Sequence, residues 1–346
     1  MDKSLSKGKF IENLRIIDIL GKGAYGQVCL GLHEETQKFY AIKSLSHRTK
    51  QQLLQERMEI GIHARLSDHP HIIELKRVIR NEETNQTHIV MEYCPEGDLF
   101  TAITEKGLYA GNHLLIRKVF LQLLNAVSYC HQNGVYHRDL KPENILVFNG
   151  GNTVKLTDFG LATTSAISQD YGCGSTFYFS PECRGDLLRG ANHIGYATAP
   201  NDIWALGVIL INLTTGRNPW KQASLQDETF CAYLNNSDFL LHILPISREL
   251  NRIIKCIFCI DPARRIGLNE LRERIIRCKY FTRTAESDRY ERLYSSSIPL
   301  QLPPSPPATP NRTRSPSPVA ACQKKATSKK YDADMAIHAI PAAFQV

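Results

Sequence analysis

Residues 136–146 of the chain read Tyr-His-Arg-Asp-Leu-Lys-Pro-Glu-Asn-Ile-Leu, and this stretch determines the interpretation of the rest. Asp139 lies within it and offers a carboxylate that can accept a proton from a hydroxyl group. Lys141 follows two residues later and offers an ammonium that can neutralise a phosphoryl group during transfer. The stretch therefore predicts a catalytic loop for phosphoryl transfer.

A second polar stretch, residues 155–160, reads Lys-Leu-Thr-Asp-Phe-Gly. Its Asp158 supplies a carboxylate oxygen, and Asn144 of the first stretch supplies an amide oxygen. Magnesium prefers hard oxygen ligands, completed in such sites by phosphate oxygens. We therefore expect Asn144 and Asp158 to bind Mg²⁺.

A glycine-rich segment precedes both stretches, with Gly-Lys-Gly-Ala-Tyr-Gly-Gln-Val at residues 21–28. Glycines at these positions allow the backbone to approach phosphate oxygens without a Cβ in the way. A dinucleotide-binding loop would continue into a helix, whereas residues 27–32 continue as a β-prone run. The glycines are therefore expected between two strands, above a nucleotide, and a plain glycine-rich hairpin is the alternative.

Lys43 ends the apolar run Ala41-Ile42 and is expected on a strand. A carboxylate on the following helix could hold its ammonium against a polyphosphate. The helix is predicted over residues 51–66, with Leu54, Met58, Ile62 and Leu66 on one face. Glu59 is the first choice of partner for Lys43, and Glu56 is the second.

These stretches together resemble the eukaryotic protein kinases over residues 15–285. The resemblance implies an α+β, bilobal fold, with a small β-rich lobe at 15–95 and a larger, mainly helical lobe at 96–285. Residues 1–14 then form an N-terminal extension. The implied cofactors are ATP and Mg²⁺.

The resemblance also assigns roles to individual residues. Asp139 is implied as the catalytic base with Lys141 beside it, and Asn144 and Asp158 as the ligands of two magnesium ions. Ser180-Pro181-Glu182 matches a family element whose glutamate is expected to pair with Arg265. The implied ATP-binding residues are Leu20, Gly21, Lys22, Gly23, Ala24, Tyr25, Gly26, Gln27, Val28, Lys43, Glu59, Met91, Glu92 and Cys94, with Met91 as gatekeeper and 92–94 as the adenine-binding hinge.

Lys141 after Arg-Asp-Leu is typical of the Ser/Thr branch of that family. A narrower resemblance, carried by residues 179–183, 201–204, 216–224 and 243–247, is to a fungal group of Ser/Thr kinases. That group contains the fission-yeast kinase that negatively regulates conjugation and meiosis, which implies a nutrient- or cell-cycle-linked role. The rival hypothesis from another class is a nucleotide-binding pseudokinase that acts as a scaffold.

Substrate choice and switching can also be predicted. Asp98 and Glu143 match carboxylates that face the third residue before the phosphoacceptor in similar kinases, so we expect protein substrates with Arg there; contact with ribose or solvent is the alternative.

The usual acceptor of an activating phosphate is replaced by Tyr171. We expect Asp170 to substitute partly for that phosphate, leaving control to abundance or an inhibitor protein, and phosphorylation of Ser168 or Tyr171 is the competing hypothesis.

Composition sets the outer limits. The 346 residues carry 42 Lys and Arg against 34 Asp and Glu, for a net charge of +8. Residues 291–346 carry half of that excess, which leaves no nucleic-acid-binding patch in the rest. Residues 286–346 are rich in Pro, Ser, Thr and Lys and are predicted to be a disordered tail. No membrane span or secretory signal is recognised, so we expect reduced cysteines and an intracellular protein, cytoplasmic or nuclear.

Overall fold

The computed structural model describes residues 7–23, 26–46, 49–81, 85–185 and 195–297. They form two compact units, one of residues 7–108 and 118–167 and the other of residues 109–117 and 168–297. Ala24 and Tyr25 of the predicted ATP-binding residues lie outside the described residues, as do residues 298–346 of the predicted disordered tail. Residues 286–297 of that predicted tail instead lie in a helix, Ala285–Ser297. The predicted domain boundaries stay predictions.

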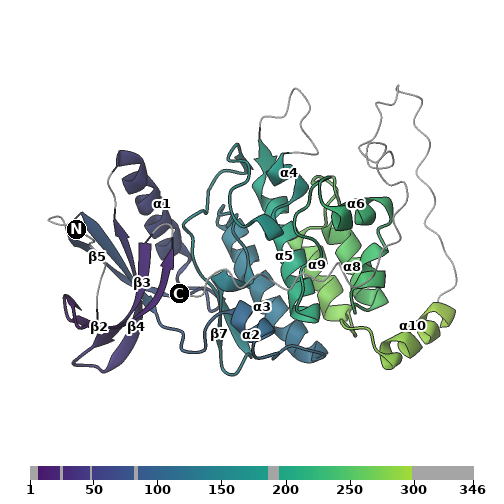
Figure 1. Ribbon diagram of the computed structural model, residues 1–346, viewed down its shortest axis with the longest axis horizontal. Helices are drawn as coiled ribbons and strands as arrows, with labels where there is room; N and C mark the ends of the chain where they lie inside the picture. Colours follow the sequence, from purple (N-terminus) through teal and green to yellow (C-terminus); the bar gives the residue numbers. More distant parts are fainter. Residues whose placement is uncertain (1–6, 24–25, 47–48, 82–84, 186–194, 298–346) are drawn as a thin grey trace. The chain divides into compact units, whose positions relative to one another are not determined.

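The first unit is built around an antiparallel sheet in the order β1-β2-β3-β4-β6-β5 (Figure 1). Its strands are β1 (Phe10–Ile11), β2 (Leu14–Gly23), β3 (Gly26–His33), β4 (Lys38–Ser46), β5 (Leu75–Asn81) and β6 (Gln86–Glu92). The three β-prone runs predicted around Cys29, Tyr40 and Ile89 lie in β3, β4 and β6. The sheet places Lys43 on β4 beside Val28 of β3.

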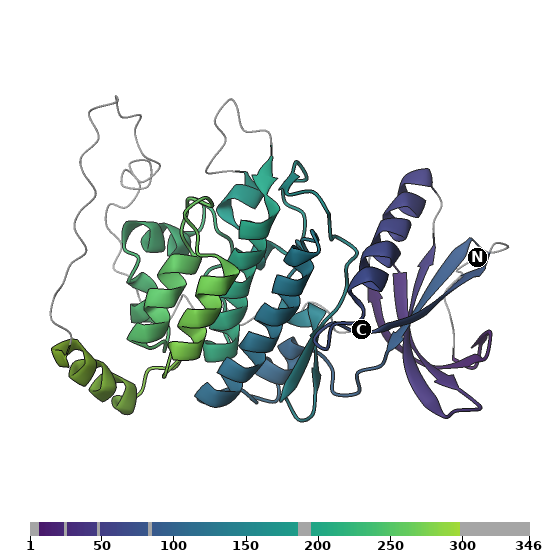
Figure 2. The same cartoon turned by 180° about the vertical axis from the view of Figure 1, so that it is seen from behind.

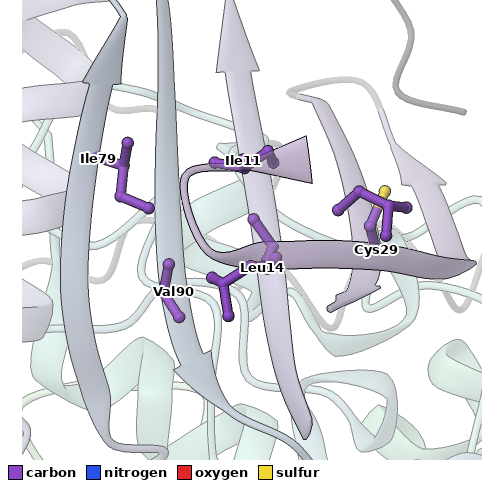
Figure 3. Packing of buried hydrophobic residues seen from close by; sticks show 7 residues of the cluster. Ile11, Leu14, Cys29, Ile79 and Val90 are labelled. Atoms are coloured by element: carbon purple, nitrogen blue, oxygen red, sulfur yellow. The ribbon is translucent and has the colours of Figure 1, made fainter. Parts of the chain in front are cut away.

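Side chains on the two faces of this sheet belong to two apolar clusters, as the alternation along a strand requires. One cluster contains Ile42 and Val90, which are register partners on β4 and β6, and Figure 3 shows Val90 with Ile11, Leu14, Cys29 and Ile79 of the same cluster. The other cluster contains Ala41 and Met91, the register partners one position away. Register on β4 is therefore fixed from both faces, and with it the position of Lys43.

Helix α1 (Lys50–Leu66) follows β4. Its start is set by a capping box, in which the Thr49 hydroxyl accepts from the Gln52 backbone N–H and the Gln52 side chain accepts from the Thr49 N–H. The predicted apolar face is wrong in its first half, because Leu54 and Met58 are 61% and 45% exposed. Glu56 and Glu59 are buried instead, since both find polar partners on the protein side of the helix.

The remaining elements of the first unit carry the polar stretches. They are α2 (Leu99–Thr104), the 3₁₀ turn η1 (Pro142–Asn144), β7 (Ile145–Phe148) and β8 (Thr153–Leu156). Strands β7 and β8 form an antiparallel hairpin, with Ile145 opposite Leu156. Helix α3 (His113–Gln132) and strand β9 (Ile167–Ser168) each contain residues of both units. The hairpin brings the residue before β7, Asn144, next to the residue after β8, Thr157.

The second unit is mainly helical (Figures 1 and 2). Its elements are η2 (Thr176–Tyr178), α4 (Pro181–Arg184), β10 (Tyr196–Ala197), α5 (Thr198–Thr215), α6 (Glu228–Asn235), α7 (Phe239–Ile243), α8 (Arg248–Ile257), α9 (Leu268–Arg277) and α10 (Ala285–Ser297). Helix α5 is apolar and buried all round, which makes it the centre of this unit. A Cβ on its Gly207 would lie 2.4 Å from Ile257 Cγ2 of α8, so glycine is required for the two helices to pack.

The expected mixture of a β-rich part with one helix and a mainly helical part is confirmed as an α+β fold. In the part of the chain that the structure describes, no helix combines the length and apolar character needed to cross a bilayer. Likewise, no three His, Cys, Asp or Glu side chains among the described residues converge on a metal-binding cluster. Cys256 lies in α8 and Cys259 follows it, as free thiols.

Candidate functional site

The predicted catalytic loop lies between α3 and β7, and its backbone is held in an unusual conformation. Arg138 has a φ of 63°, in the left-handed region that side chains other than glycine rarely adopt. The conformation is maintained by hydrogen bonds on both sides, because Arg138 Nε donates to Leu161 O at 2.7 Å and the His137 ring contacts Thr157 O at 3.0 Å. Such strained positions gather at functional sites.

Asp139, Lys141 and Asn144 converge in this loop. Lys141 Nζ lies 3.0 Å from Asp139 Oδ2. Asn144 Nδ2 donates to Asp139 O at 2.9 Å and to Asp139 Oδ2 at 3.1 Å. Asp139 itself is buried, at 8% exposed. The arrangement fixes one carboxylate between a cation and an amide, in a position to accept a proton.

The β7–β8 hairpin brings the second polar stretch to the first. Thr157 N donates to Asn144 O at 3.0 Å, which places Asp158 one residue from the loop. Asp158 also has a left-handed φ, of 63°. Because Asn144 uses Nδ2 as a donor, its oxygen is the atom with which it would hold a cation. The donor set of one amide and one carboxylate oxygen fits Mg²⁺.

Lys43 joins the sheet, helix α1 and this hairpin. Its Nζ donates to Glu59 Oε1 at 2.6 Å and to Asp158 Oδ1 at 2.9 Å. The predicted pairing of Lys43 with Glu59 is therefore present. The second choice, Glu56, instead accepts from Thr87 Oγ1 at 2.6 Å. Three chain segments far apart in sequence thus meet at a single ammonium.

Electrostatics favour the charged forms of Lys43 and Asp158, whereas burial raises the pKa of Glu59 despite its contact with Lys43. Burial alone would lower the pKa of Lys43, but the charges of Asp158 and Glu59 outweigh burial and raise that pKa above its ordinary value. Burial also opposes ionisation of Asp158, yet Lys43 holds the pKa of Asp158 below its ordinary value. The group is therefore an anchored cation with a carboxylate facing the proposed metal position.

The neighbours of Asp158 support its position. Phe159 is fully buried, with its ring centroid 5.2 Å from those of His63 on α1 and His137 of the catalytic loop. Gln55 Nε2 donates to Gly160 O at 3.2 Å. Sequence reasoning missed Gln55 and His63, although both lie four residues from Glu59 on α1, a spacing that puts side chains on one helix face.

The described parts of the glycine-rich segment form the two predicted strands, which pair with each other. Gly21 pairs with Val28, Lys22 with Gln27 and Gly23 with Gly26 across β2 and β3. Gly26 has a φ of 152°, and a Cβ there would lie 2.2 Å from Ser44 O. Only glycine fits this position, so the start of β3 can lie close to β4. Gly26 is two residues before Val28, which is the register partner of Lys43.

The predicted gatekeeper and hinge residues end β6 and follow it. Met91 is buried in the cluster with Ala41. The Glu92 carboxylate accepts from Lys155 Nζ at 2.7 and 2.8 Å, a pairing across 63 residues that sequence reasoning missed. The Cys94 thiol donates to Val147 O at 2.8 Å. Leu20, predicted above the nucleotide, is 46% exposed on β2.

The predicted pairing of Glu182 with Arg265 is present in the second unit. Arg265 Nη2 donates to Glu182 Oε2 at 2.9 Å, its Nη1 donates to Glu182 Oε1, and both side chains are buried. Its guanidinium lies 4.9 Å from the Trp204 ring centroid on α5. This bidentate pair ties the start of α4 to the segment between α8 and α9.

Comparisons with known proteins agree with this geometry. Residues 14–276 match the family model described as "Protein kinase domain". The chain is 49% identical over 291 residues to the "Negative regulator of sexual conjugation and meiosis" of Schizosaccharomyces pombe, covering 79% of this chain and 61% of that protein. In Saccharomyces cerevisiae, it is 38% identical over 234 residues to "Serine/threonine-protein kinase VHS1" and 39% identical over 236 residues to "Serine/threonine-protein kinase SKS1". Each match covers 65% of this chain, but only 50% and 46% of those two proteins.

Proposed function

Because this chain belongs to the protein kinase family, we propose that it is an ATP- and Mg²⁺-dependent protein serine/threonine kinase. The observation that carries the proposal is the contact of Lys43 Nζ with both Glu59 and Asp158. Since the chain spans about half to three fifths of the length of these relatives, the activity of the whole protein is part of the proposal.

The roles proposed for the residues follow from their chemistry. Asp139 accepts the proton of the substrate hydroxyl, and Lys141 next to it offsets negative charge on the phosphoryl group. Asn144 and Asp158 would hold Mg²⁺, which supplies positive charge against the phosphate oxygens when bound. Lys43 would position the α- and β-phosphates of ATP, with Glu59 holding its ammonium in place.

The nucleotide is proposed to lie beneath the glycine-rich turn. Residues 20–28 would cover it, and the end of β6 with the hinge at 92–94 would contact the adenine. Support comes from Gly26, whose lack of a Cβ lets the start of β3 lie against β4. Since the Glu92 carboxylate is engaged by Lys155, the hinge would use backbone groups rather than this side chain.

The test is the substitution Asp139→Asn in the full chain. It keeps the side-chain shape but removes the proton acceptor, so phosphotransfer to a basic peptide should fall by about 10²–10⁴-fold. Binding of a fluorescent ATP analogue should stay nearly unchanged, which separates chemistry from nucleotide binding. Equal activity of purified mutant and wild type, with contaminating kinases excluded, would overturn the assignment. The pseudokinase scaffold instead predicts no phosphotransfer by either protein, and it has no observation in its favour.

We further propose that the enzyme selects Arg at the third residue before the phosphoacceptor. Glu143 Oε2 is buried without a hydrogen-bond partner in the described part of the chain, and burial raises the pKa of Glu143, with Asp98 adding to the rise. Asp98 Oδ1 caps α2 by accepting from Thr101 N at 2.7 Å, and the rest of its charge together with Glu143 suits a guanidinium. A positional peptide library should show selection for Arg at that place, and the selection should disappear with Glu143→Gln.

We propose that activity does not need a phosphate added by an upstream kinase, with Asp170 substituting partly. Ser168 is buried and its Oγ accepts from Asp170 N at 3.1 Å, while the Tyr171 hydroxyl accepts from Gly195 N at 3.0 Å. Both rival acceptor hydroxyls are thus engaged. Phosphatase-treated enzyme should be active from the first time point, and a lag abolished by prior phosphorylation would contradict this.

The biological role that we propose is regulation of the switch to conjugation and meiosis, within the cytoplasm or nucleus. It rests on the printed name of the fission-yeast relative and on an identity of 49%. Control by abundance or by an inhibitor protein would fit an enzyme with intrinsic activity. Deletion of the gene should change when cells enter conjugation or meiosis.

A further inference from the structure

The second unit contains a polar cavity that takes no part in the proposed chemistry. It has a volume of about 850 Å³ and lies among α7, α8, α10 and the residue Arg283 before α10. Its lining is dominated by basic side chains. These are Arg248, Arg252, Lys255, Arg283 and Arg292.

Three carboxylates also line the cavity, and each already has a basic partner. The ion pairs are Lys255–Asp238 at 2.5 Å, Arg283–Asp288 at 3.3 Å and Arg252–Glu291. Five basic against three acidic side chains leave an excess of two positive charges. Arg248, at the start of α8, is exposed and forms no ion pair within the described residues. The excess charge predicts an anionic ligand of about two negative charges, such as a phosphate monoester.

A buried acceptor narrows the choice of ligand. Asn251 of α8 lines the cavity, is 3% exposed, and donates through Nδ2 to Asp238 Oδ1 at 2.6 Å. Its Oδ1 is buried with no hydrogen-bond partner in the described part of the chain. Buried acceptors normally have a donor. A peptide N–H or the O–H of a hydrogen phosphate dianion supplies one, so the lining favours a phosphorylated ligand that also carries a donor.

We propose that the cavity binds residues 303–310 of this same chain, phosphorylated on Ser305. Residues 298–311 carry no charged side chain, so a phosphate on Ser305 would be the only charge of the segment. Thr309, Ser315 and Ser317 also precede proline, but each has an arginine three residues away, Arg312 or Arg314, that would compete with the cavity for the phosphate. The charge pattern therefore selects the earlier site.

The segment is close enough in sequence to reach the cavity. Arg292, which lines the cavity, lies in α10, and this helix ends at Ser297. Seven residues lie between Ser297 and Ser305, and the eight steps from one Cα to the next can span up to about 27 Å when extended. Attachment to the same chain gives the segment an effective concentration on the order of millimolar. Modest intrinsic affinity is then sufficient for occupancy.

The phosphate itself must come from a proline-directed kinase with ATP as co-substrate, since Pro306 follows Ser305. In that step the Ser305 oxygen forms a bond to the γ-phosphorus, the bond to the β–γ bridging oxygen breaks, and ADP and the hydroxyl proton leave. The product carries about 1.5–2 negative charges at neutral pH. These would match the excess charge of the cavity.

The first test is binding of a fluorescent peptide of residues 298–311 to phosphatase-treated full-length protein. The peptide phosphorylated on Ser305 should bind at least tenfold more tightly than the same peptide without phosphate. Arg248→Glu should remove at least tenfold of that affinity. The matched control is Arg289→Glu, which makes the same change of charge at an exposed residue of α10 that does not line the cavity. The affinity of this variant for the phosphopeptide should lie within about twofold of the wild-type affinity.

Two results would overturn the site: no preference for the phosphorylated peptide, or equal losses for Arg248→Glu and Arg289→Glu. Thermal unfolding of both variants verifies that the fold is kept. The source of the ligand is tested separately, with full-length protein phosphorylated on Ser305. It should bind the added phosphopeptide at least tenfold more weakly than the unphosphorylated protein, because its own segment occupies the cavity. Equal binding by the two forms would show that the chain's own segment is not the occupant.

Discussion

At the scale of single residues, the ammonium of Lys43 is the point on which the proposed site depends. Glu59 and Glu56 are both buried on α1, yet only Glu59 contacts Lys43. We expect Glu59→Gln to lower kcat/KM by about 100-fold, because a neutral amide holds the ammonium less firmly and the phosphates lose their position. Steady-state kinetics with a peptide substrate provide the measurement.

Glu56→Gln is the matched control for that substitution. It alters an equally buried carboxylate, but one that accepts from Thr87, so kcat/KM should change much less. Similar losses of kcat/KM for both variants would mean that the substitutions act by disturbing helix α1, and not through the contact of Glu59 with Lys43. Comparing unfolding midpoints separates the two explanations.

The convergence of the two polar stretches could be predicted from sequence because it depends on residue type and order, and the roles of their residues stay predictions. The choice of Glu59 over Glu56 was correct. The contact of Glu92 with Lys155 could not be predicted, because it joins residues far apart in the chain and no local pattern marks it. The same is true of the buried Asn251 oxygen.

At the scale of elements, the ion pair of Glu182 and Arg265 joins α4 to the segment after α8. Removing one partner of a buried pair leaves an uncompensated charge, so Arg265→Leu should lower the free energy of unfolding by about 3–5 kcal/mol. Denaturant titration measures this. Arg274→Ala, which breaks an exposed pair with Glu270 within α9, should cost less than about 1 kcal/mol. Comparable losses would contradict the importance of burial.

Long apolar runs made most central elements predictable, whereas short ones were missed. The strand runs around Cys29, Tyr40 and Ile89 and the helix of residues 51–66 were predicted correctly in kind. Strands of two residues such as β1 and β10 carry no periodic signal. The buried face of α1 was predicted wrongly because the prediction relied on the spacing of the apolar residues. The structure instead buries two carboxylates of this helix, Glu56 and Glu59, against polar partners.

At the scale of the whole molecule, two buried and three half-buried histidines predict a loss of stability in mild acid. Burial lowers the pKa values of His63, His69, His71, His88 and His113 below the ordinary value. The unfolded chain therefore binds protons near pH 6.5 that the native state does not, so stability is complete above that pH and declines as pH falls below it. Each histidine contributes a slope of at most about 1.4 kcal/mol per pH unit.

Thermal unfolding between pH 8 and about pH 5 checks this expectation. The His63→Gln variant should show a shallower dependence on pH whatever its absolute stability. His242→Gln, at an exposed position, should leave the dependence unchanged. An unfolding midpoint that stays flat or rises towards acid would contradict the prediction.

The double contact of Lys43 also has a consequence for chemical reactivity. An amine attacks acylating or sulfonylating reagents only in its neutral form, and the two carboxylates keep Lys43 protonated by raising its pKa. Lys43 should therefore be labelled more slowly than the exposed Lys221, as measured by mass spectrometry over time. In Glu59→Gln, labelling of Lys43 should accelerate. The carboxylates of Glu59 and Asp158 would thus protect the Lys43 amine from the reagent, and loss of the Glu59 charge would make this amine nucleophilic.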